Sequence, residues 1–319
     1  MQLITGGKGF IGMNTARALL ELGEPCVLTT GDETRRLPDF LQKELGNRIF
    51  VERLDLTDRE SVRAVGKTYK ITGIIHLSGA VIGRGSFQDT WEETQHTLNG
   101  ALNIFWAARE WGVSRVSIAS TIGVYAGSED EAFKENSPVP LSATHALPMS
   151  KKVLELIGGI LSFGSELQVV NLRIGGTWGP LFHHAPSPMN VIGHLIRGAV
   201  AGRNLTPWPI YEETGTDSLY VKDTGRAIAM IQLAKSLQYS TYNVGSGRAL
   251  TIKEVVAAIR EVVHDAEIAL NPGFDPRGMA KTYVMDTSRL REDTGFEPEY
   301  DVRKGVADYV EWLNAGNEN

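Results

Sequence analysis

The feature that most constrains the fold is a glycine-rich loop close to the start of the chain. Residues 5–12 read TGGKGFIG, so that Gly6, Gly9 and Gly12 recur at every third position. The apolar pair Leu3-Ile4 before the loop predicts a strand, and apolar side chains at helical spacing over residues 11–22 predict a helix after it. A glycine triplet alone indicates only a turn. Between a strand and a helix, it lets backbone amides approach a pyrophosphate at the helix N-terminus, and it predicts dinucleotide binding.

The chain after this loop alternates short apolar runs with amphipathic stretches. Five further runs read as strands, at residues 26–30, 49–51, 74–77, 116–120 and 169–173. Helical patterns lie between them, including a long one with apolar positions over 98–108 and another over 151–163. Strands that are apolar on both faces and connected by helices predict an α/β fold with a doubly wound parallel sheet of the Rossmann type.

The regular alternation ends near residue 179, which predicts a second, smaller unit. Segments 181–215 and 272–283 are rich in Pro, Gly and His and are interpreted as loops that close over a crevice. We expect a dinucleotide-binding domain over 1–178, to which 217–244 returns, and a C-terminal substrate-binding subdomain made mainly of 179–216 and 245–319.

Composition argues against several classes of protein. A formal net charge of −6 over 319 residues does not suit a protein that grips nucleic acid through a basic surface. Cys26 is the single cysteine, and no apolar run is long enough to predict a membrane span. The glycine motif follows Met1 so closely that we expect no signal peptide. His183 and His184 are adjacent, so their side chains diverge, and no cluster completes a metal site. We expect a cytoplasmic protein without a metal.

The choice of dinucleotide depends on the residues that follow the second predicted strand. An acidic residue there binds the adenosine ribose in NAD-binding proteins, whereas arginine accommodates the 2′-phosphate of NADP. Thr30 occupies the strand end, Asp32 comes two residues later, and Arg35-Arg36 follow. Asp32 favours NAD, Thr30 with either arginine favours NADP, and a solvated charged loop explains the same residues without a ligand. We predict NAD and leave NADP open.

With the glycine loop, further segments resemble the extended short-chain dehydrogenase/reductase family, in its NAD-dependent epimerase/dehydratase branch. These segments are Asp55-Leu56, 76–80 (HLSGA), 120–125 (STIGVY), 172–180 (LRIGGTWGP), 217–223, 242–245 and 286–296. The resemblance implies an oxidoreductase that acts on a carbinol or carbonyl carbon of a small substrate, such as a nucleotide sugar. The coenzyme contacts that we predict are Gly6, Gly9, Phe10, Ile11, Gly12, Thr30, Asp32, Arg35, Asp55, Leu56, Leu77, Ser78, Gly79 and Lys151.

The resemblance also implies a catalytic Tyr-x-x-x-Lys pair assisted by a Ser or Thr. Thr121 takes the Ser/Thr place, and Lys151 takes the lysine place at the nicotinamide ribose, with Lys152 as the alternative if the register shifts by one. The position four residues before Lys151 is Leu147, which has no proton to transfer. Three explanations stay open. His145, whose ordinary pKa suits proton transfer, replaces the tyrosine; the substrate or an ordered water does so; or the chain is a catalytically inactive sensor or regulatory protein that binds the coenzyme.

The remaining predictions concern the substrate and a second subunit. The resemblance places Thr121, Trp178, His183 and Arg277 at the substrate. A second departure from the family is Thr97, where its members carry asparagine. In the family, the long helix with the 98–108 stripe and the helix after Lys151 commonly pair across a homodimer, so we expect a homodimer.

Overall fold

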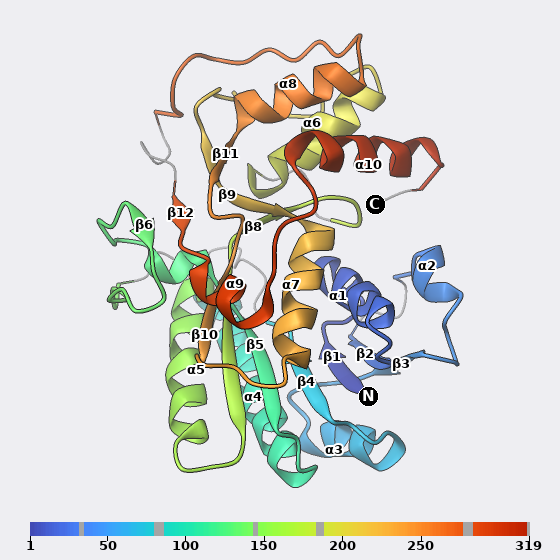
Figure 1. Cartoon of the computed structure of the whole chain (residues 1–319), viewed down its shortest axis with the longest axis vertical. Coiled ribbons are helices and arrows are strands. Elements are labelled where there is room, and N and C mark those ends of the chain that lie inside the picture. The colour runs from blue at the N-terminus through green and yellow to red at the C-terminus, as the bar shows by residue number, and fades with distance from the viewer. Residues whose placement is uncertain (32–34, 80–85, 143–145, 183–187, 277–282, 318–319) are drawn as a thin grey trace.

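A seven-stranded parallel sheet forms the centre of the computed structural model (Figure 1). The structure describes residues 1–31, 35–79, 86–142, 146–182, 188–276 and 283–317. The strands are β1 (Gln2–Thr5), β2 (Cys26–Thr30), β3 (Ile49–Arg53), β4 (Gly73–His76), β5 (Arg115–Thr121), β7 (Gln168–Ile174) and β10 (Thr241–Val244). They lie in the order β10-β7-β5-β4-β1-β2-β3, and every neighbouring pair is parallel. The predicted doubly wound parallel sheet is confirmed.

Helices cover both faces of this sheet because its central strands are apolar on both sides. One face is covered by α1 (Phe10–Glu21) and α7 (Val221–Leu233), and the other by α3 (Arg59–Thr68), α4 (Phe87–Glu110) and α5 (Ala146–Ser162). On β4, Ile75 packs into the first layer and Ile74 into the second. Side chains alternate along a strand, so His76 projects to the same side as Ile74, toward α4 and α5.

The C-terminal unit has its own small sheet and core. Its sheet contains β8 (Gly176–Trp178), β9 (Gly215–Tyr220) and β11 (Ala249–Thr251), and its helices are α6 (Val191–Val200), α8 (Ile252–Val262) and α10 (Val302–Asn314). These helices gather at the top of Figure 1, beyond the carboxyl ends of the large sheet. The interpretation of 181–215 as loop is wrong for residues 191–200, because α6 buries Ile192, Leu195 and Ile196 in this core.

Short elements complete the chain, and one position in the sheet determines where a ligand fits. The short elements are α2 (Asp39–Gln42), α9 (Ser288–Thr294), β6 (Ala132–Phe133), β12 (Val284–Met285) and the 3₁₀ turns η1 (Ile122–Tyr125) and η2 (Pro188–Asn190). From β1 the chain continues to β2 on one side, whereas β4 lies on the other. Ligands of open α/β sheets bind at such a switch point, beyond the carboxyl ends of the strands. No helix among the described residues has both the length and the apolar character that a membrane span requires.

Candidate active site

The glycine loop lies at this switch point and packs backbone against backbone. Gly6 has a φ of +64°, a conformation that favours glycine, and a Cβ there would lie 3.1 Å from the amide nitrogen of Ser78. The amide of Gly9 donates a 2.8 Å hydrogen bond to the carbonyl of Gly6. A Cβ on Gly12 would lie 2.5 Å from that same oxygen. Larger residues at these positions would therefore separate α1 from the loop.

The N-terminus of α1 is suited to an anion. Its N-cap is Gly9, no side chain caps the helix, and the first turn contains no acidic residue. The first amides of a helix carry partial positive charge and attract anions. Phe10 is buried, with its ring centroid 4.7 Å from that of Phe182, and Ile11 is half-buried beside it. An uncapped helix end beside a loop that only glycine fits is compatible with the pyrophosphate of a dinucleotide.

The residues predicted at the adenosine side follow β2 and β3. The carbonyl of Thr30 accepts a hydrogen bond of 3.2 Å from the amide of Leu54, so the ends of the two strands lie together. The exposed carboxylate of Asp55 accepts from the amide and hydroxyl of Thr57, at 2.8 and 2.7 Å, and these bonds lower the pKa of Asp55. Leu56 is buried against α4, where Gly100 leaves room for its side chain.

Arg35 contacts the segment that follows β8. Its Nη2 donates a 2.7 Å hydrogen bond to the carbonyl of Leu181, 146 residues further along the chain. Leu181 is buried, and its φ is +75°. No other non-glycine residue that the structure describes has a positive φ. Arg35 therefore connects the loop after β2 to the start of the second unit. Asp32, the alternative ligand for the ribose, lies outside the described residues.

The turn after β4 brings three predicted residues to the glycine loop. The amide of Leu77 donates to the carbonyl of Thr5 at 3.2 Å, and the amide of Ser78 donates to its hydroxyl at 3.4 Å. A Cβ on Gly79 would lie 2.7 Å from Nζ of Lys151. The turn therefore lies between the glycine loop on one side and the lysine of α5 on the other.

Lys151 is a buried cation without a counter-ion. The residue is 5% exposed, and burial lowers the pKa of its amine to about 8. Among the described residues, no group accepts a hydrogen bond from its Nζ. Lys152 differs, because its ammonium donates to the backbone carbonyls of Pro140 and Ser142. Lys151 is therefore the lysine that remains open to a ligand.

Thr121 lies at the carboxyl end of β5, next to the first turn of α5. Its hydroxyl accepts a 3.2 Å hydrogen bond from the amide of Gly123 and thereby caps η1. A Cβ on Gly123 would lie 3.5 Å from both Oγ1 of Thr121 and Cγ of Pro148. Leu147 lies one helical turn before Lys151 and is half-buried. His145, the predicted substitute for a tyrosine, lies outside the described residues.

A buried polar network supports these strand ends. Glu155 on α5 forms a 2.7 Å ion pair with Arg173 on β7 and accepts a 2.5 Å hydrogen bond from the hydroxyl of Ser120 on β5. Arg173 also donates to the hydroxyl of Tyr125 at 2.8 Å, and this hydroxyl donates to Asn243 at 2.7 Å. No sequence pattern indicates this network, because its partners are distant in the chain. Glu155 and Arg173 are 18 positions apart, and the other pairs are separated by 35 to 118 positions.

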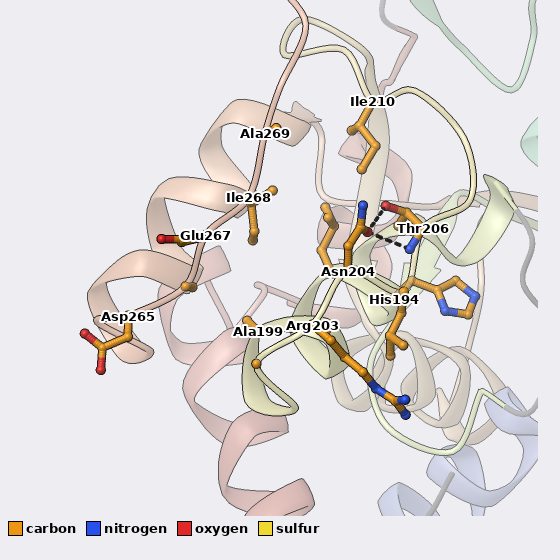
Figure 2. A pocket seen from close by; sticks show the side chains of 15 residues that line it. His194, Ala199, Arg203, Asn204, Thr206, Ile210, Asp265, Glu267, Ile268 and Ala269 are labelled. Carbon is orange, nitrogen blue, oxygen red and sulfur yellow. Dashed lines mark hydrogen bonds between the residues drawn. The ribbon is translucent and has the colours of Figure 1, made fainter.

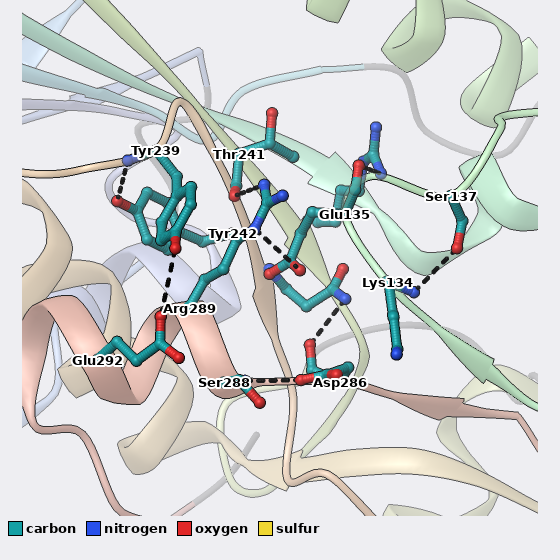
Figure 3. A network of polar contacts seen from close by, with 12 residues as sticks. Lys134, Glu135, Ser137, Tyr239, Thr241, Tyr242, Asp286, Ser288, Arg289 and Glu292 are labelled. Carbon is teal, nitrogen blue, oxygen red and sulfur yellow. Dashed lines mark hydrogen bonds and ion pairs between the residues drawn. The ribbon is translucent and has the colours of Figure 1, made fainter.

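The network continues through Glu135 in the segment after β6, as Figure 3 shows. Glu135 accepts from the amide of Asn243 at 2.8 Å and pairs with Arg289 at 3.6 Å. Burial raises the pKa of Glu135. Strand ends and helices that carry predicted site residues are thus bound together, and Tyr125 is part of this framework.

Of the residues predicted to contact the substrate, the structure describes some and not others. Trp178 is 4% exposed, packs edge-on against Tyr220 and lies against Gly305. The predicted substrate contact of Trp178 stays a prediction: the residue packs in the core of the C-terminal unit, and it also lines a second cavity, of about 250 Å³, with Ser218 and Arg248. His183 and Arg277 lie outside the described residues.

One cavity of about 390 Å³ lies away from all of the predicted residues. It is enclosed by the end of α6 and the segment after α8, as Figure 2 shows, and Asn204 fixes its wall by accepting from the amide and hydroxyl of Thr206. No residue predicted at the coenzyme or substrate lines it, so it is not the candidate active site. Within the described ranges, no three His, Cys, Asp or Glu side chains are grouped to hold a metal ion.

Comparisons with known proteins agree with this geometry. The model of the NAD dependent epimerase/dehydratase family matches residues 2–245. The chain is 24% identical to UDP-glucuronate 4-epimerase of Thermodesulfobacterium geofontis, over 97% of this chain and 95% of that protein. It is 26% identical to dTDP-glucose 4,6-dehydratase of Streptomyces griseus, over 98% and 93%. The structure of the UDP-glucose 4-epimerase of Thermus thermophilus in complex with NAD matches with a TM-score of 0.80 at 25% identity, over 99% and 100% of the two chains. The family predicted from the motifs is confirmed: the chain belongs to the NAD dependent epimerase/dehydratase family.

Proposed function

We propose that this chain is an NAD-dependent epimerase or dehydratase that acts on a hydroxyl-bearing carbon of a nucleotide sugar. The observation that carries the proposal is the meeting of three elements at the carboxyl edge of the sheet. They are the uncapped glycine loop, the turn after β4, and the buried amine of Lys151 beside Gly79. Two relatives of the chain are a UDP-glucuronate 4-epimerase and a dTDP-glucose 4,6-dehydratase, and this supports a nucleotide sugar as substrate.

When bound, NAD supplies a reversible acceptor for a hydrogen and its electron pair. The residues of the chain bind and orient the reactants. The glycine loop and the first amides of α1 hold the pyrophosphate, and Lys151 holds the nicotinamide ribose. The hydroxyl of Thr121 orients the reacting oxygen of the substrate. His183 and Arg277 are proposed to contact the remainder of the substrate.

NAD is proposed over NADP on the position of Arg35. The Nη2 that would meet a 2′-phosphate donates instead to Leu181. Asp32 is the proposed ligand of the ribose hydroxyls, and Asp55 and Leu56 are proposed to contact the adenine.

The test begins with binding and continues with turnover. Titration calorimetry with NAD and NADP should give the tighter binding for NAD. The loaded protein is then incubated with UDP- and dTDP-linked hexoses, and proton NMR follows the formation of an epimer or a 4-keto product. Absence of NAD binding would refute the coenzyme assignment, and NAD binding without any product would refute the enzymatic one.

Leu147 favours a second candidate function, that of an NAD-binding sensor without turnover. A leucine one turn before Lys151 provides no proton where the family resemblance implies a tyrosine. Under the enzymatic proposal, another group must transfer the proton in place of that tyrosine, and His145, the substrate and a bound water are the alternatives that the sequence leaves open. The Leu147→Tyr variant separates the two functions, because a sensor with a degenerate site would gain activity from a wild-type level of zero.

We also propose a homodimer formed by α4 and α5, and a cytoplasmic location. These two helices pack against each other, and their outer surface exposes large apolar side chains, among them Leu102, Trp106, Leu156 and Ile160. Leu156 and Ile160 are 71% and 70% exposed and lie one turn apart. An apolar surface that extends over two helices is typical of an interface. Sedimentation should therefore detect a dimer that Leu156→Glu dissociates, whereas Leu22→Glu at the end of α1 preserves it.

A further inference from the structure

Two buried polar atoms without a hydrogen-bond partner lie at the turn after β4, close to the amine of Lys151. Nε2 of His76 and Oγ1 of Thr97 have no hydrogen-bond partner, and each residue is 2% exposed. The Cβ position of Gly79 lies 2.7 Å from Nζ of Lys151 and 4.0 Å from Cγ2 of Thr97. Buried polar groups in native proteins are nearly always paired. A cluster of unpaired groups at one place therefore points to a reacting ligand or to water there.

The tautomer of His76 follows from its two neighbours. Its Nδ1 lies 2.7 Å from the hydroxyl of Thr5. Burial lowers the pKa of His76 to about 3, with the positive charge of Lys151 adding to the effect, so the ring is neutral. If Nδ1 carries the proton, Nε2 keeps an unshared lone pair, which the nearby positive charge of Lys151 favours. The other tautomer would bury an N–H without an acceptor beside a cation. We therefore assign the Nδ1–H tautomer.

No carboxylate among the described residues offsets the charge of Lys151. Glu155 lies one turn further along α5, a spacing that predicts an ion pair, but its carboxylate is bound to Arg173. The facing elements carry His76 on β4 and, on α4, His96 and the carboxylates of Glu92 and Glu93. Neither carboxylate acts on the pKa of Lys151, whereas the charge of His96 acts on His76. The amine of Lys151 is therefore free of a counter-ion among the described residues.

Described groups near α5 that could exchange a proton are few. Leu147 has none to exchange. The hydroxyl of Tyr125 is committed to Asn243 and Arg173, and burial raises its pKa to about 12. We propose that Lys151 itself transfers the proton to and from the substrate hydroxyl, and that His76 is a positioning residue whose unshared Nε2 lone pair stabilises the ammonium form from the β4 side. This inference rests on the proposed function.

The proton transfer balances without a further reactant. The neutral amine of Lys151 accepts the proton of the substrate hydroxyl and becomes an ammonium as the carbon is oxidised to a carbonyl. The hydrogen and electron pair of that carbon leave with the coenzyme of the proposed function. The ammonium returns the same proton when the carbonyl is reduced. Because burial brings the pKa of Lys151 to about 8, both protonation states are available near neutral pH.

The test titrates the lysine directly and compares it with the pH profile of turnover. The full-length protein is labelled with ¹³C at lysine Cε, and the resonance of Lys151 is identified by its loss in Lys151→Arg. We expect this resonance to titrate near pH 8 and kcat/KM to rise with the same midpoint. Lys151→Arg should lose at least about 100-fold in kcat and lose the pH-dependent rise. These two quantities are measured at saturating NAD, because Lys151 also holds the nicotinamide ribose in the proposed function. His76→Leu should move the midpoint to lower pH, and His76→Gln, which restores an acceptor, should return it.

A control variant and two kinds of contrary outcome separate this inference from the proposed function. Lys152→Arg changes the neighbouring lysine, whose ammonium is bound to carbonyls, and should leave the midpoint in place. A resonance that titrates above about pH 10, the ordinary range of a lysine, or a Lys151→Arg variant that keeps the pH-dependent rise, would overturn the inference while the proposed function stands. A wild-type protein that binds NAD but converts no nucleotide sugar would overturn the proposed function and the inference with it.

Discussion

The ion pair between Glu155 and Arg173 should stabilise the protein far more than an ion pair on its surface. The side chains are 11% and 6% exposed, and the pair is bidentate, with contacts of 2.7 and 3.0 Å. Glu155→Gln preserves shape but removes the charge, and it replaces one of the two carboxylate oxygens that accept from Arg173 with an NH₂ group that cannot accept. Breaking a buried pair by changing one partner costs about 3–5 kcal/mol. We expect Glu155→Gln to lower the free energy of unfolding by this amount.

A second pair provides the matched control. Arg63 and Glu110 approach to 2.6 Å, but their side chains are 37% and 34% exposed, so solvent screens them. Glu110→Gln should lower the free energy of unfolding far less than Glu155→Gln does. Both variants are measured by urea unfolding followed by circular dichroism. Equal losses would refute the argument that burial determines the contribution of these pairs. An unchanged kcat in Glu155→Gln would also refute the supporting role assigned to the network.

Three further predictions test the coenzyme loop, the arginine contact and the buried histidine. Gly12→Ala should abolish detectable NAD binding in calorimetry and cost about 1–3 kcal/mol, because its Cβ would meet the carbonyl of Gly6, whereas Gly159→Ala, in open space on α5, should preserve binding. Arg35→Ala should cost about 1 kcal/mol through the lost hydrogen bond to Leu181 and change the ratio of NAD to NADP affinity by less than about threefold; a tenfold loss of NADP affinity would contradict this. His76 should make stability fall as pH decreases from 6.5 toward 3, because the unfolded chain takes up a proton that the folded chain refuses; comparison with His76→Gln should isolate a slope of about 1.4 kcal/mol per pH unit.

The central sheet could be predicted because short runs of apolar residues identify its buried strands. Runs such as 26–30 are apolar at most positions, and all four residues of β4 are buried. Helix α6 escapes prediction although Ile192, Leu195 and Ile196 have helical spacing, because the Pro, Gly and His around them favour a loop. In this segment, the Pro, Gly and His residues lead to the prediction of a loop although the spacing of the apolar residues is that of a helix.

The candidate site could be predicted only in part, because several of its contacts join distant segments. The glycine loop and Lys151 follow from short motifs, and the structure brings both to one edge of the sheet. The contact of Arg35 with Leu181 spans 146 residues and leaves no trace in either local pattern. The same holds for Trp178, whose place in the core depends on Tyr220 and on Gly305 of α10.

The most informative difference between the sequence pattern and the structure is the choice of the cation with which Glu155 forms an ion pair. Lys151 and Glu155 lie one turn apart on α5, and sequence spacing alone predicts that they pair. In the structure Arg173 takes the carboxylate through a fork of hydrogen bonds, a geometry that a lysine cannot match. Lys151 is then left buried with an uncompensated charge, which costs stability and lowers its pKa. A carboxylate beside Lys151 would hold the amine protonated, so the ion pair of Glu155 with Arg173 is what leaves this lysine without a counter-ion, as the proposed proton transfer requires.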